Sequence, residues 1–495
     1  MPYDFEHGNG TANDPYLIAT EADFWGIFDV NSDYQPNFVG NYFRQTADIT
    51  ITQSVSINTL TRCVYDGNNH RISGLNTSLA YLYLETSTWK NSIFLNCTNE
   101  GLGSGDFPTV FQWICLEEEG VGENKLDNIQ LLNSPGIYIF AGSNIVATNL
   151  IVKNSGGFAG GTIEDSKISE CYGENLAFTQ WYYATGAFCD VFGCEFENIV
   201  VVNVEYEDTD WSAGGFVGEA YYSNFENCIV LDGKATGNRT AGGFAGGAYG
   251  CTFEDCYALG VEVTLDPSNG WSAGGFVGEA HTVGYYGHAE YLPFVFRRCV
   301  AHGTVEARAE CATGGFAGYA QPDTESIFVQ CGAEVSVSNS YEYSGGFVGQ
   351  VTEPTSEPMT VCEDCYALGD SVLSDSENAI SNGGFCGIAE DVTFERCFSK
   401  GAVSGGENVG GFCGEDTDYY YDEEEEEEYW SIECINCYYD SETSGQSDTG
   451  KGTPKTTAEM KTQLTFPQWN FINTWKIGAF AGGENESVTR IDGYY

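Results

Sequence analysis

The sequence predicts an all-β protein, a parallel β-helix or solenoid with short helical caps at both ends. The main observation is a self-similar unit that contains Gly-Gly-Phe, one small or apolar residue and a further Gly. Successive copies begin 27 to 40 residues apart when a degenerate copy at Gly186 is counted. A period of this length is typical of a solenoid. The eight clear copies begin at Gly156, Gly214, Gly242, Gly274, Gly314, Gly345, Gly383 and Gly410.

A Cys forms the second landmark of the unit and lies 12 residues after the Phe in the shortest copies. This spacing holds from Phe216 to Cys228 and from Phe244 to Cys256. It indicates a basic coil of about 28 residues, to which the longer units add inserts. Such inserts run through Thr282–Tyr291, Gln321–Ser326, Val351–Thr360 and Asp416–Trp430.

Each unit contains three short runs that alternate in polarity and are separated by Gly, Asn, Asp and Ser, which is typical of strands and turns. No segment inside the repeats has helical periodicity long enough to bridge parallel strands. Equivalent strands of successive units are therefore expected to pair, which stacks the repeated Phe and Cys inside the coil about 4.8 Å apart. The predicted Phe ladder is Phe158, Phe216, Phe244, Phe276, Phe316, Phe347, Phe385 and Phe412. The predicted Cys ladder is Cys171, Cys228, Cys256, Cys299, Cys331, Cys365, Cys397 and Cys437.

The two ends of the chain read as caps. Thr20 is placed as the N-cap of a short amphipathic helix, and Thr456 and Glu459 have the spacing of a capping box. The sequence thus divides into an N-terminal cap with a short helix (1–50), a β-helix of repeats (51–441, clearest over 156–441) and a C-terminal cap with a short helix (442–495). Capped ends predict a closed monomeric tube, since an uncovered solenoid polymerises. Lateral association into a homotrimer stays open.

Several segments of the chain resemble GLUG-motif repeat proteins. The core of the resemblance is Ala213-Gly214-Gly215-Phe216-Val217-Gly218 with Asn227-Cys228, together with Asp255-Cys256-Tyr257-Ala258-Leu259-Gly260. The segments Gly10–Ile18, Tyr42–Ile49, Asp66–Leu75, Cys437–Asp440, Thr456–Lys461 and Trp469–Phe471 resemble the blocks that flank such repeats. The resemblance implies a right-handed parallel β-helix exposed on cell surfaces or virions. It implies no catalytic residues, because the family has no shared active site.

The charge of the chain limits the classes of partner that it is expected to bind. Its 72 acidic and 19 basic residues give a formal net charge of −53, which repels phosphates and disfavours nucleic-acid binding. Acidic loops, above all Asp422 with Glu423–Glu428, offer oxygen ligands suited to Ca²⁺, although the simpler interpretation is a solvated loop. No other cofactor is predicted. No stretch approaches the roughly 20 apolar residues of a transmembrane helix.

The 19 cysteines are expected to be mostly free thiols. Parallel in-register side chains are poorly oriented for a disulfide torsion, and the repeat position favours small buried side chains. Three pairs have the spacing of metal knuckles, but the repeat frame accounts for the second Cys of each and places Cys362 where Phe225 and Phe253 lie in their units. A zinc site is therefore disfavoured. These pairs are Cys251/Cys256, Cys362/Cys365 and Cys434/Cys437.

Catalytic signatures are sparse. The five His do not recur in the repeat frame, and no nucleophile elbow, zinc-helix motif or phosphate loop is present. Paired carboxylates of a polysaccharide lyase or glycosidase are the enzymatic alternative, since β-helical enzymes of this kind exist. The first residues, Met1–His7, have no basic or apolar leader region, so no secretory signal peptide is predicted.

Binding is the favoured function. Inserts on a stiff scaffold are common recognition sites, and exposed Tyr can stack on sugars or anchor a protein interface, although packing along the flank explains them equally well. The sequence therefore predicts a non-catalytic structural and adhesive protein on a virion or extracellular surface, first of all a phage tail component that contacts a host-surface glycan or a neighbouring structural protein. The alternatives are a secreted bacterial surface adhesin and a glycan-degrading enzyme. The candidate binding residues are Tyr221, Tyr222, Tyr285, Tyr286, Tyr419, Tyr420 and Tyr421.

Overall fold

A computed structural model describes most of the 495-residue chain as two compact units. Unit 1 comprises Met1–Thr209, Phe216–Gly218 and Ser223–Ile229, and unit 2 comprises Asp210–Gly215, Glu219–Tyr222 and Val230–Tyr495. The described residues are 3–28, 37–53, 58–76, 82–98, 109–113, 123–180, 184–208, 211–265, 270–284, 291–308, 311–322, 326–339, 341–352, 359–373, 379–390, 392–416, 419–422, 427–430, 432–448, 451–479 and 486–490.

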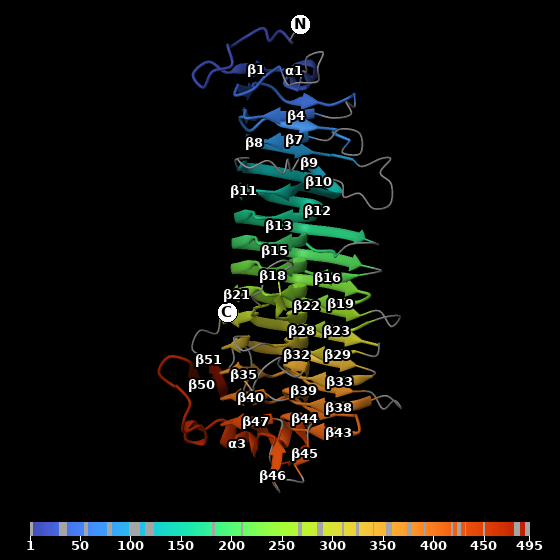
Figure 1. Cartoon of the computed structure of the whole chain (residues 1–495), viewed down its shortest axis with the longest axis vertical. Helices are drawn as coiled ribbons and strands as arrows, with labels where there is room; N and C mark the ends of the chain where they lie inside the picture. The colour runs from blue at the N-terminus through green and yellow to red at the C-terminus, as the bar shows by residue number, and fades with distance from the viewer. Residues whose placement is uncertain are drawn as a thin grey trace. The chain divides into compact units, whose positions relative to one another are not determined.

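Each unit is built from parallel strands that pair in register with their equivalents in the next coil (Figure 1). In unit 1, β13 (Lys167–Gln180) pairs with β15 (Glu195–Asp208) along its whole length, from Lys167 against Glu195 to Gln180 against Asp208. In unit 2, β22 (Tyr257–Leu265) pairs with β28 (Val300–Ala307), and β28 pairs with β32 (Gly332–Asn339). The prediction of an all-β parallel β-helix is therefore confirmed.

The other strands of unit 1 follow the same rule. Their bounds are β1 (Tyr16–Ile18), β2 (Tyr42–Gln45), β3 (Ile49–Thr50), β4 (Asn58–Thr61), β5 (Val64–Asp66), β6 (Arg71–Ser73), β7 (Leu82–Glu85), β8 (Thr88–Leu95), β9 (Thr109–Trp113), β10 (Asn124–Ser143), β11 (Ile145–Thr148), β12 (Ile151–Glu164) and β14 (Phe188–Phe192). Two strands, β17 (Val217–Tyr221) and β18 (Asn224–Gly237), contain residues of both units.

The strands of unit 2 form columns, of which the first is a seven-stranded parallel sheet. That sheet consists of β16 (Ser212–Gly214), β19 (Thr240–Gly242), β23 (Ser272–Gly274), β29 (Ala312–Gly314), β33 (Glu342–Gly345), β38 (Ala379–Gly383) and β43 (Asn408–Gly410). The next column contains β20 (Ala245–Tyr249), β24 (Val277–His281), β30 (Ala317–Gln321), β34 (Val348–Val351), β39 (Cys386–Ala389) and β44 (Cys413–Asp416). A third contains β21 (Thr252–Glu254), β27 (Val295–Arg297), β31 (Ile327–Val329), β35 (Met359–Glu363), β40 (Val392–Glu395) and β47 (Ile432–Ile435).

The remaining strands of unit 2 continue the β22–β28–β32 column or form short antiparallel hairpins. The first group is β36 (Tyr366–Ala367), β37 (Ser371–Leu373), β41 (Phe398–Ser399), β42 (Val403–Ser404), β48 (Tyr438–Asp440) and β49 (Thr453–Lys455). The hairpins pair β25 (Val283–Gly284) with β26 (Tyr291–Leu292), β45 (Tyr419–Asp422) with β46 (Glu427–Trp430), and β50 (Trp475–Ala479) with β51 (Glu486–Arg490).

The repeated Phe form a stacked column inside the coils. In unit 2 the ring centroids of Phe244 and Phe276 lie 4.8 Å apart with nearly parallel planes, as do those of Phe276 and Phe316. The column continues through Phe347, Phe385 and Phe412 at 4.8 to 5.0 Å. In unit 1 Phe158, Phe188 and Phe216 stack at 5.2 Å. All of these rings are fully buried.

A second aromatic column meets the first edge to face. Phe253 stacks on Phe296 at 4.7 Å and lies perpendicular to Phe276, an arrangement that suits the charge distribution of aromatic rings. Cys362 continues this column, because it pairs in register with Phe328 on one side and with Phe394 on the other. The Cys362/Cys365 spacing thus reflects the repeat frame, as the sequence predicted.

The cysteines within the described residues are free thiols, and all of them are buried except Cys434, which is partly exposed. At the repeat position the backbone amide of Cys331 donates to Sγ of Cys365, and that of Cys397 donates to Sγ of Cys437, both at 3.4 Å. Small thiols therefore fill the corner of successive coils. Burial raises the pKa of Cys299 and its neighbours in the ladder well above the ordinary value, which keeps them unreactive.

The residue before each repeat Cys adopts a positive φ. Asn and Asp tolerate this left-handed conformation best, and Asn227, Asp255 and Asp364 occupy it. Arg298 and Arg396 occupy it as well. Arg298 is held there by an ion pair of 2.7 Å with Asp255 of the preceding coil, and Arg396 by one of 2.8 Å with Asp364. Ion pairs therefore link these turns from one coil to the next.

Helix α1 (Glu21–Gly26) covers the first coils of unit 1. The Thr20 side chain accepts from the Asp23 amide, and the Asp23 carboxylate accepts from the Thr20 amide, which completes a capping box. Phe24 is fully buried and packs edge-on against Tyr65 and Trp89, which themselves stack at 4.0 Å. The helix therefore closes the apolar end of the coil stack.

The C-terminal segment covers both the last coil and the flank of unit 2. It contains α2 (Ser441–Ser444), α3 (Thr457–Met460) and the 3₁₀ helix η1 (Gln463–Thr465), and Thr456 and Glu459 form the predicted capping box. Gly452 lies so close to Phe412 that a Cβ would meet its Cβ at 2.6 Å, so this stretch covers the last Phe of the ladder. The chain then turns onto the flank.

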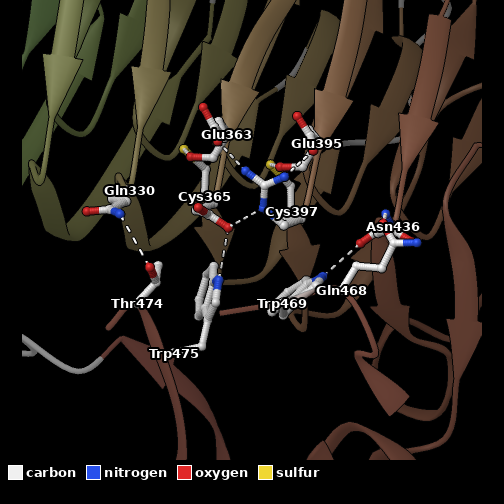
Figure 2. A network of polar contacts seen from close by, with 12 residues as sticks. Gln330, Glu363, Cys365, Glu395, Cys397, Asn436, Gln468, Trp469, Thr474 and Trp475 are labelled. Carbon is white, nitrogen blue, oxygen red and sulfur yellow. Dashed lines mark hydrogen bonds and ion pairs between the residues drawn. The ribbon is translucent and has the colours of Figure 1, made fainter. Parts of the chain in front are cut away.

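On that flank a cluster of apolar side chains joins the C-terminal segment to three successive coils. Figure 2 shows the polar contacts beside it. The Gln330 amide donates to Thr474, Asn436 donates to Gln468, and the Trp469 indole donates to the Asn436 carbonyl. The cluster consists of Met460, Phe466, Trp469 and Trp475 against Tyr366, Phe398 and Tyr438. The division at 50 and 441 read from the sequence stays a prediction.

Candidate functional site

Three successive coils of unit 2 carry nearly the same sequence over eleven residues. Residues 211–220 and 271–280 are identical, Trp-Ser-Ala-Gly-Gly-Phe-Val-Gly-Glu-Ala, and are followed by Tyr221 and His281 respectively. Between them, 239–249 reads Arg-Thr-Ala-Gly-Gly-Phe-Ala-Gly-Gly-Ala-Tyr. Because β16, β19 and β23 pair in register, equivalent side chains of these segments lie one coil apart.

The first residues of the three segments form a Trp–Arg–Trp column. The Arg239 guanidinium lies 4.5 Å from the ring centroid of Trp211 and 3.7 Å from that of Trp271. Backbone hydrogen bonds of 2.8 Å from Arg239 to Trp211 and from Trp271 to Arg239 fix the order. Both indoles remain exposed, Trp211 by 40% and Trp271 by 56%. An arginine stacked between two exposed indoles is a rigid surface feature.

Beside this column lies a buried carboxylate, Glu219. Its two oxygens accept hydrogen bonds of 2.7 Å from the hydroxyls of Ser212 and Tyr221. Ser212 in turn accepts from Thr240 of the next coil at 2.8 Å. Glu219 is only 5% exposed, and burial, with a smaller contribution from the charge of Glu279, raises the pKa of its carboxyl in spite of these bonds.

The pKa of a second buried carboxyl, that of Glu279, is shifted in the opposite direction. This carboxylate accepts a hydrogen bond from the Tyr249 hydroxyl of the preceding coil and lies 3.4 Å from Nε2 of His281. Burial opposes ionisation, but the bonds from His281 and Tyr249 and the charges of His281 and Arg239 outweigh it and lower the pKa of Glu279. The Tyr249 side chain can extend to Glu279 of the next coil because its own coil has Gly247 at the position of the glutamate. A Cβ at Gly247 would lie 2.8 Å from the tyrosine ring.

Aromatic rings continue along the stack from this point. Tyr221 and Tyr249 stack at 4.5 Å, Tyr249 and His281 at 5.4 Å, and His281 and Tyr319 at 5.2 Å. Nδ1 of His281 contacts Gln321 at 3.1 Å, and the Tyr319 hydroxyl contacts Thr352 at 2.9 Å. The side chains are therefore held in place by neighbours on adjacent coils.

The Trp–Arg–Trp column and the aromatic stack border an open groove of about 410 Å³, which we call the Trp271 groove. Aromatic rings and polar groups alternate along it, a combination found in ligand sites. Its walls are formed by Arg239, Tyr249, Trp271, Ser272, Glu279, His281, Tyr319 and Gln350.

The tyrosines singled out from the sequence lie in three places. Tyr221 is half-buried in β17 and belongs to the aromatic stack, next to the Trp271 groove. Tyr222 follows at a positive φ of 52°. Tyr285 and Tyr286 lie outside the described residues. The backbone of Tyr419, Tyr420 and Tyr421 forms β45 of a hairpin. Among the tyrosines of this set that the structure describes, Tyr221 stacks on the groove residue Tyr249, and the binding role of all of them stays a prediction.

The groove residues themselves were missed by the sequence reading. The signal was available in the perfect repetition of ten residues at 211–220 and 271–280, since no other Gly-Gly-Phe repeat of this chain carries both this Trp and this Glu. Identity at the solvent-facing Trp and at Glu is not needed for packing the core. It therefore marks a feature beyond the fold.

The described part of the chain has neither a cluster of metal-ligating side chains nor a membrane-spanning helix. Among those residues no group of three or more His, Cys, Asp or Glu is arranged to hold a metal ion. None of the helices found there has the length and apolarity that crossing a membrane requires.

The comparisons agree with the repeat architecture. The family model for the GLUG motif matches residues 237–264, which include the Arg239–Tyr249 coil of the groove. A "Putative Gly-rich membrane protein" of Evansella cellulosilytica is 34% identical over 116 residues. That match covers 23% of this chain and 12% of the relative. The chain is a parallel β-helical repeat protein that carries a GLUG motif.

Two solved structures are similar over most of the chain. One is described as a putative immunoglobulin A1 protease from Bacteroides ovatus, with 15% identity, coverage of 96% of this chain and 93% of that one, and a TM-score of 0.22. The other is the PL6 family alginate lyase AlyGC, with 7% identity, coverage of 80% and 88%, and a TM-score of 0.24. At these scores neither likeness supports an inference about activity.

Proposed function

We propose that this protein is a non-catalytic, adhesive surface protein that binds a glycan in the Trp271 groove. The observation that carries the proposal is the position of Trp271, which is 56% exposed, stacked on Arg239 and adjacent to the buried carboxylate of Glu279. An exposed indole supplies a flat apolar surface, and charged groups beside it supply directional hydrogen bonds. A sugar ring has an apolar face that can stack on the indole and hydroxyls that can form the hydrogen bonds.

Rigidity supports the same proposal. Six of the eight lining residues lie in strands, and the other two, Arg239 and Trp271, directly precede β19 and β23. Most of these side chains are held by contacts with the next coil. A preorganised site loses little conformational entropy when a ligand binds. The inserts that the sequence favoured are not needed for this site.

The decisive experiment compares two aromatic variants. Trp271→Ala removes the exposed indole, and Tyr172→Ala removes a matched exposed ring of unit 1 that also lies beside a cation, Lys153 at 5.0 Å. Binding to immobilised surface polysaccharides should fall about tenfold or more in the first variant, equal to about 1.4 kcal/mol, and stay unchanged in the second. Equal binding by both variants would reject the groove as the site.

For the biological setting, the placement we favour is the outer surface of a virion, first of all a phage tail, with a secreted bacterial surface adhesin as the alternative. A rigid repeat scaffold and a net charge of −53, which opposes self-association, support a surface role in both cases. The genes beside the coding region separate them, since structural tail genes cluster. If no glycan binds, a neighbouring structural protein becomes the expected partner.

A glycan-degrading enzyme is the second candidate function. Glu219 and Glu279 are two buried carboxyls whose pKa values are displaced in opposite directions, as acid–base catalysis on sugars requires. Incubation with the polysaccharides that bind distinguishes the two functions. Intact polysaccharide supports adhesion, whereas released oligosaccharides that disappear in Glu279→Gln would establish the enzyme.

A further inference from the structure

The aromatic surface of the Trp271 groove is partly exposed. Trp271 contacts the Arg239 guanidinium at 3.7 Å on one face and is still 56% exposed. Trp211 covers the opposite side of the guanidinium at 4.5 Å. A planar guanidinium between two rings retains its donors at the edge. The column therefore presents exposed indole surface together with a fixed set of N–H groups.

Two donors of the groove have no hydrogen-bond partner. Within the described residues, the Ser272 hydroxyl and Nε of Arg239 are buried atoms that contact no acceptor. Ser272 is 1% exposed and lines the groove. Buried hydroxyls and N–H groups are almost always satisfied, since leaving one unpaired costs about 1–3 kcal/mol. A ligand oxygen in the groove would supply the missing acceptor.

Acceptors are also present in the lining of the groove. Glu279 is 4% exposed, receives a hydrogen bond from Tyr249 and lies 3.4 Å from Nε2 of His281, and these groups lower the pKa of its carboxyl. A carboxylate has about four acceptor positions, so it retains capacity for a ligand hydroxyl. Gln350 adds an amide that both donates and accepts. The groove thus offers donors and acceptors together.

The charges of the groove balance. Arg239 and Glu279 in its lining have opposite charges, and His281, which also lines the groove, carries a charge only when it is protonated. An acidic sugar would gain Arg239 but meet Glu279 and the net charge of −53, whereas an amino sugar would gain Glu279 but meet Arg239. A neutral sugar meets neither penalty, and each of its hydroxyls can donate and accept.

The groove extends along the coil stack. Glu279, Tyr319 and Gln350 are register partners on β24, β30 and β34, and Tyr249 lies one coil before them. Three rung spacings of about 4.8 Å make this roughly 14 Å, longer than a single sugar ring. A chain of several sugars fits this length better than a monosaccharide.

From these features, and on the basis of the proposed function, we infer that the ligand of the Trp271 groove is an uncharged oligosaccharide of pyranose rings. One ring stacks on the exposed indole surface of Trp271. Its hydroxyls accept from Ser272 and Arg239 and donate to Glu279, and the following sugars run along the coils toward Gln350.

The test measures binding of six-sugar probes by isothermal titration calorimetry with the whole chain. The neutral probes are cellohexaose, xylohexaose, laminarihexaose and mannohexaose, and the charged probes are hexaguluronate, hexagalacturonate and the glucosamine hexamer. We expect a neutral probe to bind best and its affinity to change less than twofold between 50 and 500 mM NaCl, because screening affects only charged ligands. Ser272→Ala should weaken that probe about threefold to tenfold, and Tyr172→Ala should not.

The possible outcomes distinguish a failure of this inference from a failure of the proposed function. Binding confined to the uronate or glucosamine hexamers, lost on Trp271→Ala, would overturn the neutral ligand and leave glycan binding intact. Binding of a neutral probe that Trp271→Ala leaves unchanged would overturn the site. Failure of every hexamer and of every surface polysaccharide would overturn the proposed function as well.

Discussion

The indole nitrogen of Trp475 donates a hydrogen bond to Oδ1 of Asp364 at a distance of 3.1 Å, although 111 residues separate them. The same oxygen accepts from Nε of Arg396 at 2.8 Å, and Arg396 also pairs with Glu363 and Glu395 (Figure 2). Trp475 is fully buried and Asp364 nearly so. The C-terminal segment is therefore part of the polar network that joins neighbouring coils of unit 2.

Trp475→Phe tests this contact. The ring remains, but the N–H is lost, so a hydrogen bond to a buried carboxylate disappears and the free energy of unfolding should fall by about 1–3 kcal/mol. Urea denaturation followed by circular dichroism gives the value. Ile472→Ala, three residues earlier and 84% exposed, should change it by less than about 0.5 kcal/mol. A Phe variant as stable as this control would show that the bond contributes nothing.

The Phe column gives a second prediction. Phe276→Ala should lower the free energy of unfolding by about 3–5 kcal/mol, since Phe244 and Phe316, each 4.8 Å away, belong to coils that cannot close over the cavity. Val372→Ala, in β37 and 42% exposed, serves as the control and should cost less than about 0.5 kcal/mol. Comparable losses in the two variants would mean that the inward face is misassigned.

The sequence predicted the repeat frame in detail because stacking makes it periodic. Phe244, Cys256 and Cys362 each occupy a position that recurs, and one register fixes them all. The N-cap at Thr20 and the capping box of Thr456 and Glu459 were predictable as well, because a cap depends on residues close in the sequence. These features are local or repeated, so one sequence suffices to find them.

The contacts of the groove and of the flank cluster could not be predicted from the sequence. Tyr249 bonds to Glu279 of the next coil, and which of two acids a tyrosine meets depends on Gly247 leaving space for its ring. Trp475 meets Asp364 only because the chain turns back along the coils. Neither contact has a sequence period. Long-range pairs of this kind require the three-dimensional arrangement.

Thiol reactivity provides a third prediction. In guanidinium chloride without reductant, Ellman titration should find nearly all 19 cysteines reactive, because those in the described residues are free thiols. In native buffer the ladder thiols should react only as the protein opens, since they are buried and their pKa values are raised by burial. Cys434 is the one described thiol that is not fully buried. Two or fewer reactive thiols after denaturation would instead indicate a disulfide-linked ladder.

Glu219 and Glu279, the two buried carboxyls described above, give the last prediction, in which the sign of the pH dependence is tested. Burial raises the pKa of Glu219 above its unfolded value of 4.5, so its contribution to stability is complete below about pH 4.5 and is lost as pH rises through the folded value. The pKa of Glu279 is lowered, so its contribution is present above pH 4.5 and is lost as pH falls through the folded value.

The difference in unfolding free energy between wild type and Glu219→Gln should therefore decrease from pH 4 to pH 8. For Glu279→Gln the same difference should increase with pH over the lower part of that range. Urea titrations at each pH measure both, and each variant serves as the control for the other because every other acid is common to the two. Slopes of the same sign would show that hydrogen bonds from Tyr249 and His281 do not outweigh burial at Glu279, and that the groove does not hold a lasting negative charge.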